Sequence, residues 1–133
     1  MSAVVADTHA AIWYLRDPSR LSSSALAAMR QAVSDSEPIF ISAISIVEVA
    51  YLVEKGRLPL EALTRLIAAI EDNVSAFVIA ALDIAIAQTL FQIPRDKVPD
   101  MPDRIIAATA LHLNLPLITR DRQIQASGIQ TIW

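Results

Sequence analysis

Short runs of apolar residues recur along this chain, and most are followed by a segment with helical spacing. The runs cover residues 4–6, 39–41, 76–80, 115–118 and 129–132. Most of them are continuously apolar instead of alternating with polar residues, which is typical of strands that are buried on both faces. Because strands alternate with helices, the pattern predicts an α/β fold with a mostly parallel central sheet.

The helices between these strands are predicted from capping residues and apolar spacing. They cover residues 9–15, 22–36, 42–55, 60–72, 84–91 and 102–113. The third begins at Ser42 or Ser45 and ends before Gly56, which suits a helix C-terminus. The length of 133 residues and the absence of internal repeats predict a single domain, 1–133.

Composition limits the setting in which this chain works. It contains no cysteine, which excludes disulfides and thiolate metal sites. The first residues carry no basic segment and include an acid at position 7, so we expect no secretory signal, no membrane span and a cytoplasmic location. A net charge of −3 gives no overall positive field for nucleic acid, so phosphate contacts must be local. The hydrophobic share of 54% predicts a surface for self-association or a partner, and the helices that follow Ser22 and Ser42 are the candidates for it.

Four acidic residues stand where such a fold brings chain segments together. Asp7 ends the first strand, and Asp121 follows the strand at 115–118. Asp103 opens the helix that leads into that strand, and Glu48 lies near the start of the helix after the second strand. Because sites in parallel sheets form beyond the carboxyl ends of the strands, these carboxylates are predicted to meet at one edge.

Clustered carboxylates suit a hard divalent cation. Mg²⁺ and Mn²⁺ prefer oxygen ligands, keep several waters and accept phosphate oxygens in their coordination shell. A bound ion lowers the pKa of its water and neutralises charge that develops on a phosphodiester. Without a cation, four neighbouring acids would repel one another and some would stay protonated. The cluster therefore predicts a metal site for phosphodiester hydrolysis.

Each acid also has a purely structural interpretation. Glu48 follows Ser45 in the pattern Ser-Ile-Val-Glu, which is a capping box. Asp100 and Asp103 fit an N-cap and a first-turn acid, and the first and last of the four acids fit turns or helix caps. Taken one at a time, these interpretations are as good as the functional ones, and only the joint pattern favours a site.

Other polar residues carry less chemistry. His9 and His112 lack companions at metal-ligand spacing, so a structural or surface role is expected for both. The serines at 42 and 45 lack a nucleophile elbow, so they are interpreted as helix caps. Three arginines flank the acids, and they either contact phosphate or form a solvated face: Arg104, Arg120 and Arg122.

The segments VVADTHAAIWYL, ISAISIVEVAYL, DMPDRIIAATAL and LPLITRD occur in this order and span almost the whole chain. Together they resemble the PIN-domain ribonucleases, specifically the VapC-type toxins of bacterial and archaeal toxin–antitoxin pairs. The resemblance implies a three-layer α/β/α sandwich. It also implies that Asp7, Glu48, Asp103 and Asp121 match the family's four acids, as catalytic residues and metal ligands. Asp100 and Thr119 match outer polar positions of that site.

The same resemblance implies a function. It predicts an endonuclease, a hydrolase that cleaves RNA with Mg²⁺ or Mn²⁺ as cofactor. It further predicts a cognate antitoxin that occupies the groove, a homodimer that joins larger complexes, and arrest of translation or growth. The alternative is a weakly active or inactive PIN domain that binds RNA or antitoxin without turnover, although the presence of all four acids argues against it.

Two other classes of α/β protein also place an aspartate after the first strand. A haloacid-dehalogenase-like phosphatase needs Asp-x-Asp there, whereas this chain has His9 two residues after Asp7. A receiver-like signalling domain needs two adjacent early acids and a phosphoacceptor after its third strand, and the residues there are Ala80 to Leu82. Neither pattern is present.

Overall fold

The computed structural model describes residues 2–133, and strands and helices alternate along them as predicted. The order is β1 (Val4–Ala6), α1 (Thr8–Arg16), the short 3₁₀ helix η1 (Pro18–Arg20), α2 (Ser23–Ser34), β2 (Ile39–Ser42), α3 (Ala43–Glu54), α4 (Leu60–Glu71), β3 (Phe77–Ala80), α5 (Ile84–Thr89), the 3₁₀ helix η2 (Leu90–Gln92), α6 (Met101–Leu113), β4 (Leu117–Ile118), α7 (Arg122–Gln125) and β5 (Thr131–Ile132). The expected α/β class is confirmed.

The five strands form one sheet in the order β3-β2-β1-β4-β5, and all neighbouring pairs are parallel. The strand β1 is central, since Ala6 pairs with Ile41 on one side and with Ile118 on the other. The residues that follow these three positions therefore emerge side by side at the carboxyl edge. Asp7 stands in the middle of that edge.

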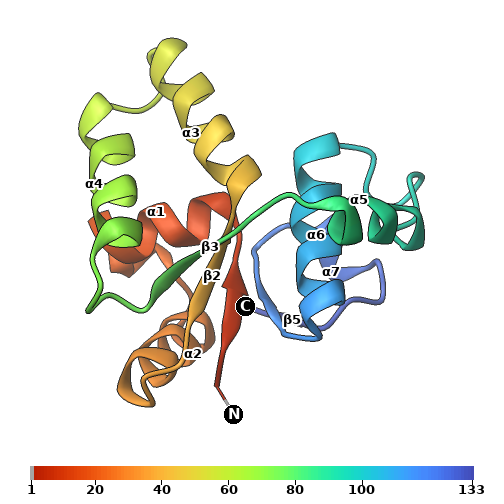
Figure 1. Cartoon of the computed structure of the whole chain (residues 1–133), viewed down its shortest axis with the longest axis horizontal. Coiled ribbons are helices and arrows are strands. Elements are labelled where there is room, and N and C mark those ends of the chain that lie inside the picture. The colour runs from red at the N-terminus through yellow and green to blue at the C-terminus, as the bar shows by residue number, and fades with distance from the viewer. Residues whose placement is uncertain (1) are drawn as a thin grey trace.

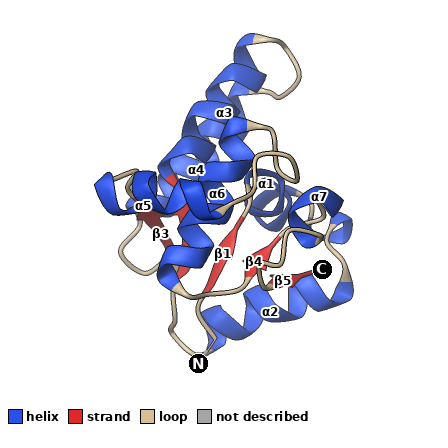
Figure 2. Cartoon of the chain, turned by 90° about the vertical axis from the view of Figure 1, so that its right-hand side faces the viewer, coloured by secondary structure: helices blue, strands red, loops and turns tan. Residues whose placement is uncertain are grey.

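Helices cover both faces of the sheet and give the expected three layers (Figure 1). Val4 and Ala6 pack into the cluster beneath α1, α2 and α4, whereas Val5 points into the opposite cluster with α6. This division follows from the alternation of side chains along a strand. The helix α3 extends away from the carboxyl edge of the sheet, as both overall views show (Figures 1 and 2). Within residues 2–133, no helix is long and apolar enough to cross a membrane.

Two expected element boundaries differ from the structure. The helix α3 begins at Ala43 and is capped by Ser42, whose Oγ accepts a hydrogen bond from Ile44 N at 3.3 Å. Glu48 therefore lies in the middle of the helix, and the capping box with Ser45 is wrong. The strand predicted from residue 115 begins only at Leu117, because the chain before it still closes α6, through Leu115 N on Ala110 O.

Candidate active site

Asp7 is fixed at the carboxyl end of the central strand by its own backbone. Its N–H donates to Ile118 O of β4 at 3.0 Å, and its Oδ1 accepts from Ala10 N at 2.8 Å as the N-cap of α1. Asp7 can cap α1 and bind a metal ion at the same time, because the capping hydrogen bond uses Oδ1 and orients the carboxylate.

Asp121 is held beside Asp7 through Thr119, which follows β4 and is fully buried. Thr119 Oγ1 accepts from Asp121 N at 3.1 Å, and the Thr119 hydroxyl lies close enough to the Asp7 carboxyl to lower its pKa. Asp121 caps α7, with Oδ1 accepting from Gln123 N and Ile124 N. Both Asp121 bonds use Oδ1, so Oδ2 accepts no hydrogen bond from residues 2–133 and stays available.

Glu48 reaches the same edge from α3. Its Oε1 accepts a 2.6 Å hydrogen bond from the hydroxyl of Thr8, which also lies 2.9 Å from Ser45 Oγ. Thr8 has one hydroxyl proton, so the consistent arrangement has Ser45 donating to Thr8 and Thr8 donating to Glu48. Thr8 and Ser45 are both buried, which fixes the Glu48 carboxylate relative to α1.

Asp100 and Asp103 come from the start of α6. Asp100 occupies the N-cap position, but its side chain makes no capping hydrogen bond, and Asp103 lies in the first turn. Both side chains line a cavity of about 340 Å³ at the sheet edge, together with the other three acids. The structure thus brings all four predicted acids and Asp100 to one cavity, whose acidic lining is Asp7, Glu48, Asp100, Asp103 and Asp121.

The cavity concentrates negative charge in partly buried surroundings. The pKa of Asp103 is raised to about 7, first by burial and then by the neighbouring carboxylates, of which Asp100 has the largest effect and Asp121 the next. Burial also raises the pKa of Asp7 and of Glu48, against the lowering effect of hydrogen bonds from Thr119 and Thr8 respectively. The site therefore favours anything that brings positive charge into it.

The donor set fits a hard divalent cation, because the acidic lining consists of carboxylate oxygens. No group of three acidic, imidazole or thiolate side chains within residues 2–133 is arranged to hold a metal ion by itself. The carboxylates of the cavity still suit an ion that keeps several waters and binds only one or two protein carboxylates together with a substrate phosphate.

Comparison with known proteins shows the family of this chain. The model of the PIN domain matches residues 4–128. The chain belongs to the PIN-domain family. This PIN domain is 29% identical over 126 residues to Ribonuclease VapC22 of Mycobacterium tuberculosis, and the match covers 95% of this chain and 92% of the relative.

Solved structures show the same fold. This PIN domain is similar to a chain of the toxin–antitoxin complex from Klebsiella pneumoniae, with a TM-score of 0.63 and 26% identity over 98% of this chain and 96% of the other. It is also similar to a chain of VapBC2 from Rickettsia felis bound to a promoter DNA fragment, with a TM-score of 0.72 and 14% identity over 97% and 96%. The resemblance to VapC-type PIN domains is confirmed.

The three arginines proposed for phosphate contact lie in different surroundings in the PIN domain. Arg120 lines the cavity, with its Cζ 4.8 Å from the ring centroid of Trp13. Arg104 instead turns inward, where its Nη2 donates to Leu90 O at 3.0 Å and to Ile93 O at 2.9 Å. Arg122 is exposed on α7 and does not line the cavity. The geometry supports a phosphate contact for Arg120 and assigns Arg104 to holding the loop before α6.

Two residues of α1 belong to the cavity although the sequence did not predict them there. His9 and Trp13 both line the cavity, with ring centroids 5.5 Å apart. His9 was expected to be structural or on the surface, and it is exposed at the rim beside the acids. Their positions in the sequence could have indicated this, because His9 and Trp13 lie in the first two turns of the helix that Asp7 caps.

Proposed function

We propose that this PIN domain, residues 1–133, is a metal-dependent endoribonuclease and the toxin of a toxin–antitoxin pair. The observation that carries the proposal is the convergence of Asp7, Glu48, Asp103 and Asp121 on one cavity in a VapC-like fold. RNA is the proposed substrate because the curated relative is named a ribonuclease. A cytoplasmic location and arrest of translation or growth belong to the same proposal.

The four acids would hold Mg²⁺, or alternatively Mn²⁺, as PIN-domain nucleases generally use divalent ions. When bound, the ion supplies an activated water and neutralises charge on the scissile phosphate. Thr119 and Thr8 orient Asp7 and Glu48 through their hydroxyls, and Asp100 adds an outer carboxylate. Ser42 caps α3, and the hydroxyl of Ser45 is used by Thr8, which leaves water as the nucleophile.

The proposed partners are a cognate antitoxin and a second copy of this chain. Solved relatives are described as toxin–antitoxin complexes, which supports an antitoxin. The helix α3 exposes Val47 and Tyr51, which are 48% and 60% accessible, and Leu60 is exposed at the start of α4. Large apolar side chains left in water mark association surfaces.

Cleavage of total cellular RNA by the purified, antitoxin-free protein tests the activity. We expect fragments with Mg²⁺ or Mn²⁺, none with EDTA, and none from Asp7→Asn or Glu48→Gln, while folding stays nearly intact because charge repulsion is relieved. Asp96→Asn and Glu54→Gln are matched controls, since both acids are exposed and do not line the acidic cavity. Full activity of Asp7→Asn would reject the site.

The same variants separate the enzyme from its alternative, a PIN domain that only binds. A binding module would give no metal-dependent fragments, yet Asp7→Asn would still associate with RNA or antitoxin. An enzyme loses turnover in that variant and keeps the fold. Circular dichroism of each variant establishes that the comparison is made between folded proteins.

A further inference from the structure

A second cavity, of about 590 Å³, lies beside the acidic one, and four arginines are among its lining residues. We call it the arginine pocket, after Arg16, Arg20, Arg57 and Arg120, which surround Trp13. These arginines come from the end of α1, from η1, from the loop between α3 and α4, and from the segment after β4. Four separate segments thus deliver guanidinium groups to one place.

The arginine pocket and the acidic cavity lie next to each other. His9, Trp13 and Arg120 line both of them. A chain molecule that has one group in the acidic cavity therefore has its next groups within reach of the arginine pocket.

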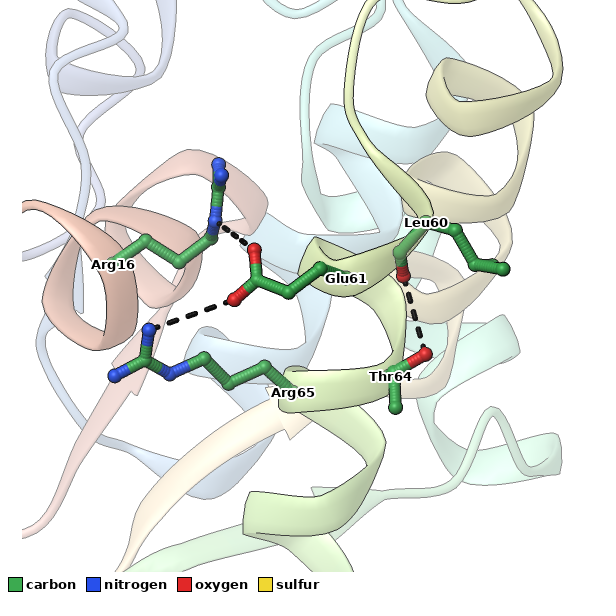
Figure 3. A network of polar contacts seen from close by, with 5 residues as sticks. All are labelled: Arg16, Leu60, Glu61, Thr64 and Arg65. Carbon is green, nitrogen blue, oxygen red and sulfur yellow. Dashed lines mark hydrogen bonds and ion pairs between the residues drawn. The ribbon is translucent and has the colours of Figure 1, made fainter.

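The charge of the arginine pocket is opposite to that of the chain. The protein carries a net charge of −3, yet this lining has four arginines against one carboxylate, Asp17. Arg16 is partly neutralised, because its Nε lies 2.9 Å from Glu61 Oε2, and Glu61 also pairs with Arg65 at 3.5 Å (Figure 3). Arg20, Arg57 and Arg120 form no salt bridge within residues 2–133 and keep their full charge.

Trp13 organises two of these cations in advance. The Cζ atoms of Arg20 and Arg120 lie 5.0 Å and 4.8 Å from its ring centroid. Trp13 is itself almost buried and contacts Trp133, with ring centroids 6.1 Å apart. A guanidinium that packs on an aromatic ring keeps the N–H donors at its edge, so it is positioned for phosphate without losing donors.

We propose that the arginine pocket binds backbone phosphates of single-stranded RNA that flank the cleaved phosphodiester. This rests on the proposed function, which puts the scissile phosphate in the acidic cavity. Carboxylates there repel the rest of the polyanion, so its neighbouring phosphates need cations supplied by the protein. Guanidinium groups suit that task, because they bind phosphate oxygens through two parallel N–H bonds. An acidic protein segment is the competing occupant.

Binding of a labelled single-stranded 10-nucleotide RNA, followed by fluorescence anisotropy, tests the pocket without turnover. All proteins carry Asp7→Asn, which prevents cleavage during the titration. The double variant Arg20→Gln/Arg57→Gln is compared with Arg30→Gln/Arg95→Gln, whose arginines are exposed and line neither cavity. Both doubles remove the same charge, so a difference between them reports position and not net charge.

We expect the pocket double to weaken RNA binding about tenfold and to reduce the slope of log K against log salt by about 1.4, since each of the two lost phosphate contacts on a single strand removes about 0.7. The control double should change affinity less than about twofold. With Asp7 restored, the pocket double should raise KM for the 10-nucleotide RNA more than it lowers kcat.

Equal losses of RNA affinity in the two double variants, or no loss in either, would overturn the proposed role of the arginine pocket. Cleavage of RNA by the wild type would still support the proposed function in that case. Displacement of RNA by oligoglutamate of equal charge and concentration would assign the pocket to an acidic protein segment and also overturn the proposal. Absence of both RNA binding and cleavage in folded protein would reject the pocket and the nuclease together.

Discussion

The position of Asp103 in the acidic cavity has a direct energetic consequence. Its pKa is raised to about 7, mainly by burial and then by Asp100 and the other acids of the cavity. The pKa of an Asp in an unfolded chain is about 4, so between about pH 4 and pH 7 the folded protein holds the Asp103 proton more tightly than the unfolded chain does. The stabilising effect of the proton is complete below about pH 4 and is lost as the pH rises through about 7.

Without divalent metal, the free energy of unfolding should therefore fall between pH 5 and pH 8. After allowance for solvent screening of a partly exposed group, we expect Asp103 to contribute about 1 kcal/mol, or about 3 °C in Tm. Added Mg²⁺ or Mn²⁺ should raise Tm more at pH 8 than at pH 5, because the ion binds ionised carboxylates. Thermal unfolding across this pH range, with and without EDTA, measures both effects.

Asp103→Asn provides the decisive comparison at this position. The variant should be more stable than the wild type at pH 8 without metal, and it should lose most of the Tm increase that metal gives. Asp96→Asn, an exposed acid away from the cavity, should behave as the wild type does. A wild-type pH profile that is flat, or that rises from pH 5 to pH 8, would mean that the Asp103 proton is not held as described.

At the scale of elements, a hydroxyl chain ties α1 to α3. Ser45 and Thr8 are both buried, and Thr8 donates to Glu48 at 2.6 Å. Thr8→Val keeps the shape but leaves the Ser45 hydroxyl and the Glu48 carboxylate without this partner. We expect about 1–3 kcal/mol lower stability and a 10- to 100-fold lower kcat, as for other residues that orient metal ligands.

Thr8→Ser restores the hydroxyl and should recover most of the kcat. Steady-state kinetics and thermal unfolding of the two variants separate hydrogen bonding from packing. Equal impairment of Thr8→Ser and Thr8→Val would show that the γ-methyl group, and not the hydroxyl, is what matters at this position.

Local signals were sufficient to predict most elements. The run at 4–6 became β1, and serine and aspartate caps at Ser22 and Asp83 start α2 and α5 as expected. The meeting of Asp7 and Asp121 followed from the strand ends, because parallel strands present their carboxyl ends together, whereas Glu48 and Asp103 reach the same edge from helices. The start of α3 was harder to predict, because Ser42 and Ser45 are equally good caps and only the end of β2 decides between them.

The arginines could not be assigned from the sequence, because long side chains follow contacts from distant segments. Arg104 turns inward to carbonyls of η2 and the following loop, and Arg120 packs on Trp13, which is more than a hundred residues earlier in the chain. Arg20 and Arg57 lie outside every motif, so nothing local marks the arginine pocket. It exists only once α1 and the α3–α4 loop are brought together.

At the scale of the whole molecule, apolar side chains are left exposed in several places, and two of these surfaces carry aromatic side chains. One includes Val47 and Tyr51 of α3, and the other includes Ile84 of α5 and Phe91 of η2, which are 77% and 91% accessible. Only the first was anticipated, since the sequence pointed to the helices after Ser22 and Ser42. The second surface arises because α5 is short and presents few residues to the core.

The proposed homodimer on α3 gives a direct expectation for association. Tyr51→Glu places a charge among exposed apolar side chains, and it should convert the antitoxin-free dimer to a monomer in size-exclusion chromatography with light scattering, with Tm unchanged. Phe91→Ser removes an even more exposed aromatic group on the other surface and should remain dimeric. Dissociation by Phe91→Ser alone would move the dimer interface to α5, and a monomeric wild type would reject the dimer.

The most direct test of a metal ion acting on phosphate at this cavity is the cleavage rate of one defined RNA with sulfur in place of a non-bridging oxygen at the scissile phosphate. Mg²⁺ strongly prefers oxygen, whereas Mn²⁺ accepts sulfur more readily. The account predicts that the sulfur substitution slows cleavage much more with Mg²⁺ than with Mn²⁺, and that Asp7→Asn is inactive with both. Equal slowing with the two ions, or cleavage in EDTA, would contradict it.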